Sequence, residues 1–308
     1  MANPWTLGPG GGATAEHARF PARALTRIPP MARKTVLDLQ AMKAGNQKIA
    51  MVTAYDYTMA RLVDAAGVDM VLVGDSLGMV VQGQPDTLSV TMDDMAYHGR
   101  CVARGLAEAH LTVDMPFMSY QVSAAQALTN GGRLIKETGC QSVKLEGGAR
   151  SAPAIQALVE AGIPVVGHIG LTPQSVHQLG GFKVQGRGEA AAEQLVRDAA
   201  AVQEAGAFCL VLEMVPAELA AEISAQLDIP TIGIGAGAGC DGQVLVCNDL
   251  LGLDARFHPR FVKRFAELQN PVIDAVRHYV DEVRQGAFPA DEHSFHRARG
   301  PHRVARLY

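Results

Sequence analysis

Short apolar runs recur along the chain, and an acidic residue follows directly after four of them. The runs and their acids are Met70–Gly74 before Asp75, Leu111–Val113 before Asp114, Val143–Leu145 before Glu146 and Cys209–Leu212 before Glu213. Each run predicts a buried parallel strand with a carboxylate at its C-terminal end. In α/β barrels and open α/β sheets, active sites assemble at that edge. Acids that converge on one rim favour a hard divalent cation together with a general base.

Strand and helix patterns alternate without a break between the two ends of the chain. The eight predicted strands centre on Ala50–Thr53, Met70–Gly74, Leu111–Val113, Ser142–Leu145, Pro164–Gly167, Cys209–Leu212, Thr231–Ile234 and Val244–Cys247. Helical patterns such as Thr58–Ala66 and Ala190–Ala205 lie between them, and crossovers of this kind make the strands parallel. The pattern predicts a closed (β/α)8 barrel of the TIM type. A doubly wound sheet is disfavoured because the sequence has neither two distinct halves nor a dinucleotide fingerprint.

The two ends of the chain depart from this alternation. Residues 1–30 are rich in glycine and proline and offer no apolar face, so we expect a disordered N-terminal extension. Its arginines raise the alternatives of a transit peptide, which Pro29-Pro30 argues against, and of a start codon assigned upstream of Met31. Residues 31–296 form the predicted catalytic domain, and residues 297–308 form a basic C-terminal tail.

Composition excludes several classes of function. The formal net charge of -4 and the pI near 6.2 give no electrostatic basis for binding nucleic acid or an anionic membrane. No apolar run approaches the roughly 20 residues that are needed to span a bilayer. The five cysteines are odd in number and include no C-x-x-C pair, which favours reduced thiols in a cytosolic protein.

Two of the predicted strand ends offer oxygen ligands. In the second, Gly74 permits a tight turn while Asp75 and Ser76 present oxygens at the rim, although these two residues are also typical helix caps. In the third, Pro116 ends the strand and holds Asp114 at the edge. A buried acid needs a partner, because desolvating a lone carboxylate is costly. For Asp114 that partner is either Lys144 or a metal.

Lys144 and Glu146 are two residues apart on the fourth strand, so their side chains share one face. Three interpretations are open: an internal salt bridge, a Schiff base between Lys144 and a carbonyl substrate, or a lysine that pairs with an anionic substrate while Glu146 supports a cation. The carboxylates nearby favour the last over the Schiff base, because they keep a lysine protonated and poorly nucleophilic.

His168 and Glu213 end the fifth and sixth predicted strands. His168 lies at the rim in Gly167–Thr172, and its role is left open between structure and catalysis. Glu213 has apolar neighbours, and desolvation would raise its pKa, which suits a base that removes a proton beside a carbonyl.

Seven segments follow, in order, the motifs of a known family, and they are Thr53–Asp56, Val73–Gly78, Asp114–Met118, Val143–Gly148, Gly167–Gln174, Lys183–Arg187 and Ile232–Gly237. From about Thr35 to His296 the chain closely resembles the ketopantoate hydroxymethyltransferases. So many matched segments in the same order make a chance similarity implausible. Only the two ends depart from the family pattern, and they carry no candidate site residue.

The resemblance implies a (β/α)8 barrel enzyme of pantothenate and coenzyme A biosynthesis. Such an enzyme transfers a hydroxymethyl unit from the co-substrate 5,10-methylenetetrahydrofolate to 3-methyl-2-oxobutanoate and forms 2-dehydropantoate (ketopantoate). The resemblance assigns Mg2+ to Asp75, Asp114 and Glu146, and proton acceptance to Glu213. It assigns keto-acid binding to Asp75, Ser76, Asp114 and Lys144. It also implies a cytoplasmic homo-oligomer, and decamers are common in the family.

These implications agree with the chemistry of the residues. An α-keto acid can chelate one hard cation through its carboxylate and carbonyl oxygens, and the cation then stabilises the enolate formed when the C3 proton leaves. Two other functions remain open. One is a different Mg2+-dependent barrel lyase or aldolase that acts on an α-keto acid. The other is a non-catalytic binding or assembly protein, which the presence of all the candidate site residues disfavours.

Overall fold

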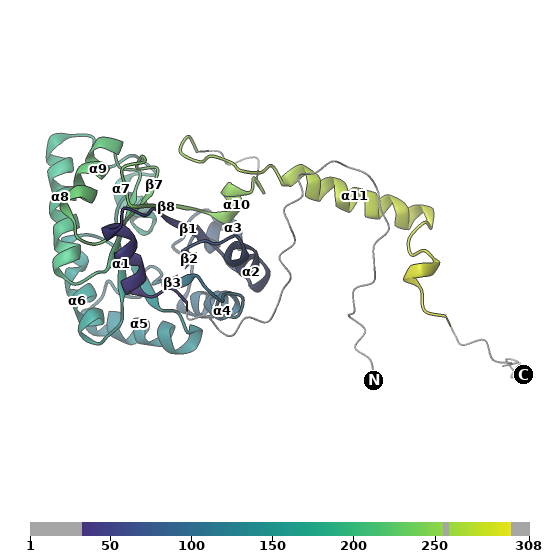
Figure 1. Ribbon diagram of the computed structural model, residues 1–308, viewed down its shortest axis with the longest axis horizontal. Helices are drawn as coiled ribbons and strands as arrows, with labels where there is room; N and C mark the ends of the chain where they lie inside the picture. The colour runs from purple at the N-terminus through teal and green to yellow at the C-terminus, as the bar shows by residue number, and fades with distance from the viewer. Residues whose placement is uncertain (1–32, 255–258, 297–308) are drawn as a thin grey trace, which may run out of the picture. The chain divides into compact units, whose positions relative to one another are not determined.

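A closed barrel of eight parallel strands forms the centre of the computed structural model, which describes residues 33–254 and 259–296 (Figure 1). The strands are β1 (Ile49–Thr53), β2 (Met70–Val73), β3 (His110–Asp114), β4 (Ser142–Glu146), β5 (Val165–Gly170), β6 (Cys209–Glu213), β7 (Thr231–Ile234) and β8 (Gly242–Leu245). Each strand pairs with the next in chain order, and β8 closes the barrel against β1. The predicted (β/α)8 TIM-type fold is therefore confirmed.

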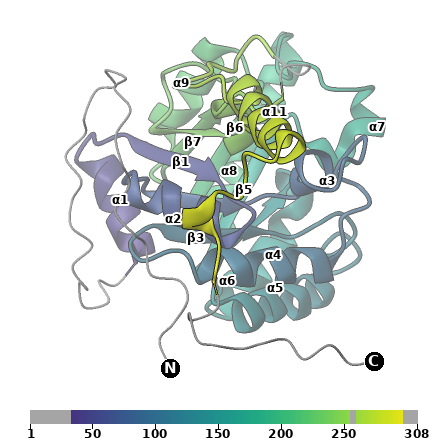
Figure 2. The ribbon, with the colours of Figure 1, turned by 90° about the vertical axis from the view of Figure 1, so that its right-hand side faces the viewer.

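Helices between successive strands cover the barrel from outside (Figures 1 and 2). They are α2 (Tyr57–Ala65), α3 (Leu77–Val80), α4 (Met92–Ala103), α5 (Ala124–Thr138), α6 (Ala152–Glu160), α7 (Val176–Leu179), α8 (Glu189–Glu204) and α9 (Ala217–Gln226), with short 3-10 turns at Ala149–Ser151 and Pro173–Ser175. Helix α1 (Val36–Ala44) precedes the first strand. Helices α10 (Cys247–Leu250) and α11 (Gln269–Gln285) and a 3-10 turn at Asp291–His293 follow the last strand, and α11 has no buried residue. Neighbouring helices pack side by side around the barrel, as α4 and α5 do in Figure 2.

Local signals set the ends of these helices. The Ser123 side chain accepts a hydrogen bond from the backbone N–H of Gln126 and so begins α5. Gly139, at φ 72°, ends the same helix in the left-handed conformation that glycine adopts without steric cost. Thr35 and Asp38 form a reciprocal capping box at the start of α1.

The alternation of side chains along the strands creates two apolar cores. On β4, Val143 and Leu145 point outward and pack beneath the surrounding helices. A second cluster fills the inside of the barrel and consists of Ile49, Met51, Met70, Leu72, Val166, Phe208, Cys209, Val211, Ile232 and Val244, together with Leu39 from α1. The interior is thus packed with side chains and leaves chemistry to the ends of the strands.

Helix α1 lies against the N-terminal end of the barrel. Its Leu39 is fully buried in the interior cluster. Lys43 donates hydrogen bonds to the backbone oxygens of Ser224 and Ile229 and to the Asp241 carboxylate, which precede β7 and β8. These contacts close one end of the barrel, so the opposite, C-terminal end is the one available to ligands.

All eight predicted strands overlap those of the structure, and the eighth is shifted by two residues at each end. The apolar run predicted Val244–Cys247, whereas β8 spans Gly242–Leu245 and α10 begins at Cys247. The strand begins with a glycine because the backbone there is crowded: a Cβ on Gly242 would lie 2.4 Å from the Ile49 carbonyl oxygen. Hydrophobicity alone does not detect such a position.

Several other expectations concern features beyond the barrel. None of the five cysteines forms a disulfide. Within residues 33–254 and 259–296, no helix has the length and apolar character to cross a membrane. The predictions made for residues 1–30 and 297–308 lie outside the described residues.

Candidate active site

Charged side chains from four adjacent strands converge at the C-terminal end of the barrel, and they are Asp114 on β3, Lys144 and Glu146 on β4, His168 on β5 and Glu213 on β6. All occupy positions that alternate with the outward-facing core residues. Asp114 pairs in register with Lys144, and Glu146 pairs with His168. The fold therefore brings together every charged residue that the sequence placed at these strand ends, including His168.

Asp114 and Lys144 form a buried ion pair. The lysine Nζ lies 2.8 Å from Asp114 Oδ1, and both side chains are less than one-tenth exposed. Burial opposes the charge on Lys144, but the carboxylates of Asp114, Glu146 and Asp75 outweigh it and raise the pKa of the lysine above its usual value. Lys144 is thus held protonated, and a protonated amine is not a nucleophile for Schiff-base formation.

Asp75 stands beside this pair at the end of β2. Its backbone N–H donates to Asp114 Oδ2 at 3.0 Å. Burial raises the pKa of Asp75 well above its usual value, and the negative charges of Asp114 and Glu146 raise it further. Burial also raises the pKa of Asp114, although Lys144 opposes that shift. The carboxylates form a buried negative cluster in which each ionised acid makes ionisation of the next more costly.

Ser76 does not cap the helix that follows it. Helix α3 begins without a side-chain cap, so the capping interpretation of Ser76 is wrong. Its Oγ instead forms a 2.8 Å hydrogen bond with the Tyr55 hydroxyl. Tyr55 follows β1, so this bond joins the ends of two neighbouring strands.

His168 lies between two carboxylates. Its Nδ1 is 3.4 Å from Glu146 Oε1, and its Nε2 is 3.2 Å from Glu213 Oε2. Burial and the nearby Lys144 both disfavour protonation, yet Glu146 and Glu213 together raise the pKa of His168 to about 9. The imidazole is therefore a cation at neutral pH, and it separates the buried acids from the acid on β6.

The side chain of Glu213 is more exposed than the apolar residues around it in the sequence predicted. Its side chain is 17% exposed, while that of His168 beside it is 3% exposed. The next residue, Met214, has a positive φ of 46°, and its backbone N–H donates to the Ile234 carbonyl at 2.9 Å. The chain thus turns sharply after β6 and leaves Glu213 at the mouth of the barrel, accessible to a substrate.

Two uncharged residues of this region were missed by sequence reasoning. Gln174, in the turn after β5, donates to Asp75 Oδ2 at 2.8 Å, and its backbone N–H donates to Glu146 Oε2 at 3.0 Å. Tyr120 donates to the Gln174 side-chain oxygen at 2.7 Å. Gln174 lies inside one of the family-like segments, Gly167–Gln174, but a neutral side chain in a loop carries no charge or periodicity that would single it out.

The acids suit a hard cation, although they do not converge as a preassembled centre. Over the described part of the chain, no three His, Cys, Asp or Glu side chains are placed to hold a metal ion together. Asp75, Asp114 and Glu146 each direct an oxygen toward a protein donor instead. Mg2+ is usually held by one or two carboxylates, with substrate and water completing its shell. Buried, mutually repelling carboxylates fit that mode of binding, because a divalent cation would neutralise them.

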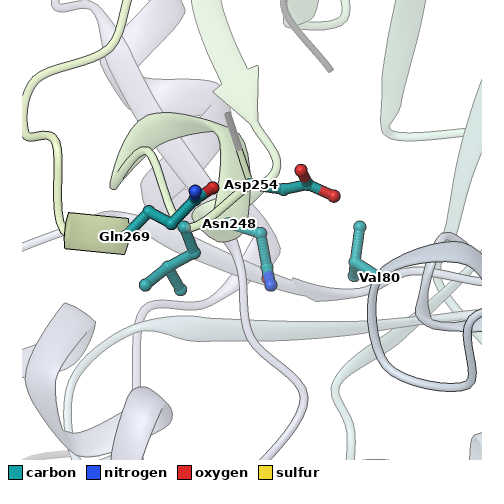
Figure 3. A pocket seen from close by; sticks show the side chains of 5 residues that line it. Val80, Asn248, Asp254 and Gln269 are labelled. Carbon is teal, nitrogen blue, oxygen red and sulfur yellow. The ribbon is translucent and has the colours of Figure 1, made fainter. Parts of the chain in front are cut away.

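A separate cavity of about 400 Å3 opens between α3, α10 and the start of α11 (Figure 3). Its lining residues are Val80, Asn248, Leu253, Asp254 and Gln269. None of them is a predicted site residue. The charged cluster, and not this cavity, therefore identifies the candidate active site.

Comparison with known proteins gives a consistent result. Residues 33–291 match the family model for ketopantoate hydroxymethyltransferase. A 3-methyl-2-oxobutanoate hydroxymethyltransferase from Syntrophotalea carbinolica is 61% identical over 263 residues, which is 85% of this chain and 98% of that protein. Proteins with the same name from Pelobacter propionicus and Anaeromyxobacter dehalogenans are each 59% identical, over 85% and 87% of this chain and 97% and 90% of their own lengths.

Solved structures share the fold at much lower identity. A phosphonopyruvate hydrolase in complex with oxalate and Mg2+ superposes with a TM-score of 0.56 at 12% identity, covering 84% of this chain and 93% of its own. A 2,3-dimethylmalate lyase of the PEP mutase/isocitrate lyase superfamily superposes with a TM-score of 0.54 at 17% identity, covering 88% and 93%. At such identities the likeness supports the barrel fold alone.

Proposed function

Because the chain belongs to the ketopantoate hydroxymethyltransferase family and is therefore an enzyme, a hydroxymethyltransferase, we propose that it converts 3-methyl-2-oxobutanoate to 2-dehydropantoate (ketopantoate) with 5,10-methylenetetrahydrofolate as the one-carbon donor. The relatives that carry this name are about 60% identical over most of the chain. The lyase-like neighbours are below 20% identical, so the comparisons favour hydroxymethyl transfer over the alternative of another Mg2+-dependent lyase or aldolase.

We assign Mg2+ to Asp75, Asp114 and Glu146, which supply the oxygen ligands that this ion prefers. When bound, Mg2+ would supply Lewis-acid stabilisation of the negative charge that develops on the keto-acid oxygen. Their burial supports the assignment, because burial raises the pKa values of Asp75 and Asp114 and so disfavours their charged forms. A divalent cation beside them would compensate the negative charge.

Lys144 and Ser76 complete the proposed binding of the keto acid. Lys144 is protonated and buried, so its ammonium offsets the substrate carboxylate without forming a covalent bond. Ser76 is held at the rim by Tyr55, where its hydroxyl can contact a substrate oxygen. Both residues bind and orient the substrate, and neither takes up the proton.

Glu213 is the proposed base. It is the most exposed acid of the cluster, and the cationic His168 lies 3.2 Å from its Oε2. A carboxylate in this position can remove the C3 proton of the keto acid, after which C3 forms a bond to the methylene carbon of the folate. Water supplies the hydroxyl oxygen as the bonds from that carbon to the folate nitrogens break, and tetrahydrofolate leaves. The observation that carries the proposal is the placement of Asp114, Lys144 and Glu213 on inward positions at one end of the barrel.

Proton exchange tests this assignment separately from carbon transfer. With Mg2+ present, the wild-type enzyme should exchange the C3 proton of 3-methyl-2-oxobutanoate with deuterated water, measured by NMR with and without the folate. Glu213→Gln keeps the shape of the side chain but cannot accept the proton, so exchange and ketopantoate formation should fall together by about 10²–10⁴-fold. Glu218→Gln makes the same change at an exposed site on α9 and should leave both rates unchanged. If Glu213→Gln exchanges the proton at the wild-type rate, the base is a different residue, and His168 becomes the leading candidate.

Two further measurements separate the alternatives. Ketopantoate should form only when both substrates and Mg2+ are present, whereas a lyase would act on its α-keto acid without any folate. Borohydride should trap no adduct on Lys144, because a protonated amine forms no Schiff base. A trapped adduct, or full activity in chelator, would instead support Schiff-base chemistry. The cytoplasmic location and the homo-oligomeric state stay predictions from the resemblance.

A further inference from the structure

The side-chain amide of Gln174 uses all of its hydrogen-bonding capacity within the protein. Its Nε2 donates to Asp75 Oδ2 at 2.8 Å and to the Met115 carbonyl oxygen at 3.0 Å. Its Oε1 accepts from the Tyr120 hydroxyl at 2.7 Å and from Gln121 Nε2 at 3.0 Å. An amide has two N–H donors and two acceptor positions, so each is satisfied. The side chain is only 5% exposed, which makes an unsatisfied group there costly.

These partners fix the direction in which the amide points. Rotating the amide by 180° would place its oxygen against the Asp75 carboxylate and the Met115 carbonyl, which cannot donate. The Tyr120 hydroxyl is itself held, because it accepts a hydrogen bond from the backbone N–H of Glu146 at 3.0 Å. Gln174 therefore presents a donor to Asp75 in a single orientation.

Gln174 also reaches a second acid of the site. Its backbone N–H donates to Glu146 Oε2 at 3.0 Å. Asp75 lies just after β2 and Glu146 ends β4, and these two strands are separated by β3 and do not pair directly. One residue in the turn after β5 therefore holds carboxylates from two strand ends that the sheet itself does not join.

We propose that Gln174 is a positioning residue for the divalent-cation site: it binds Oδ2 of Asp75 and Oε2 of Glu146 and so fixes both carboxylates, whose other oxygens can then bind the ion. This inference rests on the proposed function, in which both acids are Mg2+ ligands. A neutral donor suits the task, since it orients a carboxylate without offering a positive charge that would compete with the cation. Partners of metal ligands fix ligand orientation in this way, and their loss typically weakens metal binding by about 10–100-fold.

Mn2+ binding tests the proposal directly. Mn2+ prefers the same oxygen ligands as Mg2+, and its free concentration can be followed by electron paramagnetic resonance. Gln174→Met keeps the length of the side chain but removes the donor to Asp75, so we expect Mn2+ affinity to fall by about 10–100-fold. Gln174→Asn keeps an amide but is one methylene shorter, so its donor falls short of Asp75, and a loss of the same order is expected.

Gln121→Met is the matched control. It makes the same substitution as Gln174→Met but removes a hydrogen bond to the oxygen side of the Gln174 amide and one from the Tyr120 backbone N–H. Neither involves the Asp75 or Glu146 carboxylate, so Mn2+ affinity should change by less than about 3-fold. Melting temperatures in chelator show whether each variant is folded. If Gln174→Met fails to fold, the comparison of Gln174→Asn with Gln121→Met decides the question.

A positioning role also predicts a specific kinetic pattern. The Mg2+ concentration for half-maximal activity should rise in Gln174→Met, while kcat at saturating Mg2+ stays within about 3-fold of wild type. Unchanged Mn2+ affinity in Gln174→Met, with kcat lowered at saturating metal, would overturn the proposal. If the wild-type protein itself bound no Mn2+ or Mg2+, the proposed metal site would fail, and that result is distinct because it does not depend on Gln174.

Discussion

The charge on His168 should make the stability of the metal-free protein fall as the pH rises. Glu146 and Glu213 outweigh burial and Lys144 and raise the pKa of His168 to about 9, compared with 6.5 for an unperturbed histidine. A group whose pKa is higher in the folded state stabilises that state when protonated. Its contribution is complete below about pH 6.5 and is lost as the pH rises through about 9.

The size of the effect follows from the two pKa values. They differ by about 2.5 pH units, and each unit corresponds to about 1.4 kcal/mol, so His168 contributes roughly 3 kcal/mol at pH 6.5 that is absent near pH 9.5. The side chain is almost fully buried, so solvent screens this contribution little. A loss of this size is a large part of the free energy of unfolding of a typical domain, which is about 5–15 kcal/mol.

Denaturant unfolding in the presence of EDTA measures this directly. Wild type and His168→Gln should be compared at intervals from pH 6.5 to 9.5, and the wild-type free energy of unfolding should decrease by roughly 3 kcal/mol more than that of the variant. Burial raises the pKa of Cys140 and Cys247 to about 11 and that of Cys209 to about 12, and the resulting pH dependence is common to both proteins and cancels in the difference.

A second histidine supplies the control. Burial lowers the pKa of His110 to about 4, so this residue is neutral throughout the range, and its stabilising contribution is lost only as the pH falls below about 6.5. His110→Gln should therefore keep the wild-type pH dependence above pH 6.5. Parallel curves for wild type and His168→Gln would refute the reasoning, and so would a wild-type stability that increases with pH.

Three other changes have defined outcomes. Asp75→Asn keeps an oxygen that can accept the hydrogen bond from Gln174 but removes one of the mutually repelling charges, so the variant should melt in chelator at the same or a higher temperature than wild type. Its stabilisation by Mg2+, which is about 2.7 kcal/mol for wild type at 100 times the Kd, should disappear. Gly170 has φ +91°, and a Cβ there would lie 2.2 Å from the Glu213 carbonyl oxygen, so Gly170→Ala should lower the free energy of unfolding by about 2–4 kcal/mol, as measured with denaturant. Gly132 lies on α5 with open space around its Cβ position, so Gly132→Ala should instead raise the free energy of unfolding by up to about 1 kcal/mol. Removing residues 1–30 should leave melting temperature and turnover nearly unchanged, and a large drop in either would show that the segment is docked.

The sequence by itself determined the fold class and the charged part of the site. Parallel strands that are buried on both faces appear in the sequence as short apolar runs, and helical crossovers between them permit only a few topologies of the sheet. The two-residue period of a strand also placed Lys144 and Glu146 on one face, and the structure confirms this. An acid that directly follows an apolar run can be recognised in the sequence, because charged residues are rarely found at buried positions.

The contacts between strand ends were decided only by the tertiary structure. Gln174 and Asp75 are 99 residues apart, and Tyr55 and Ser76 meet because β1 and β2 pair side by side, not because of any local pattern. His168 is cationic because β4 and β6 bring Glu146 and Glu213 to opposite sides of its ring. Periodicity encodes which face a side chain occupies, whereas a hydrogen-bond partner or a shifted pKa depends on distances across the closed sheet, and no stretch of sequence contains those.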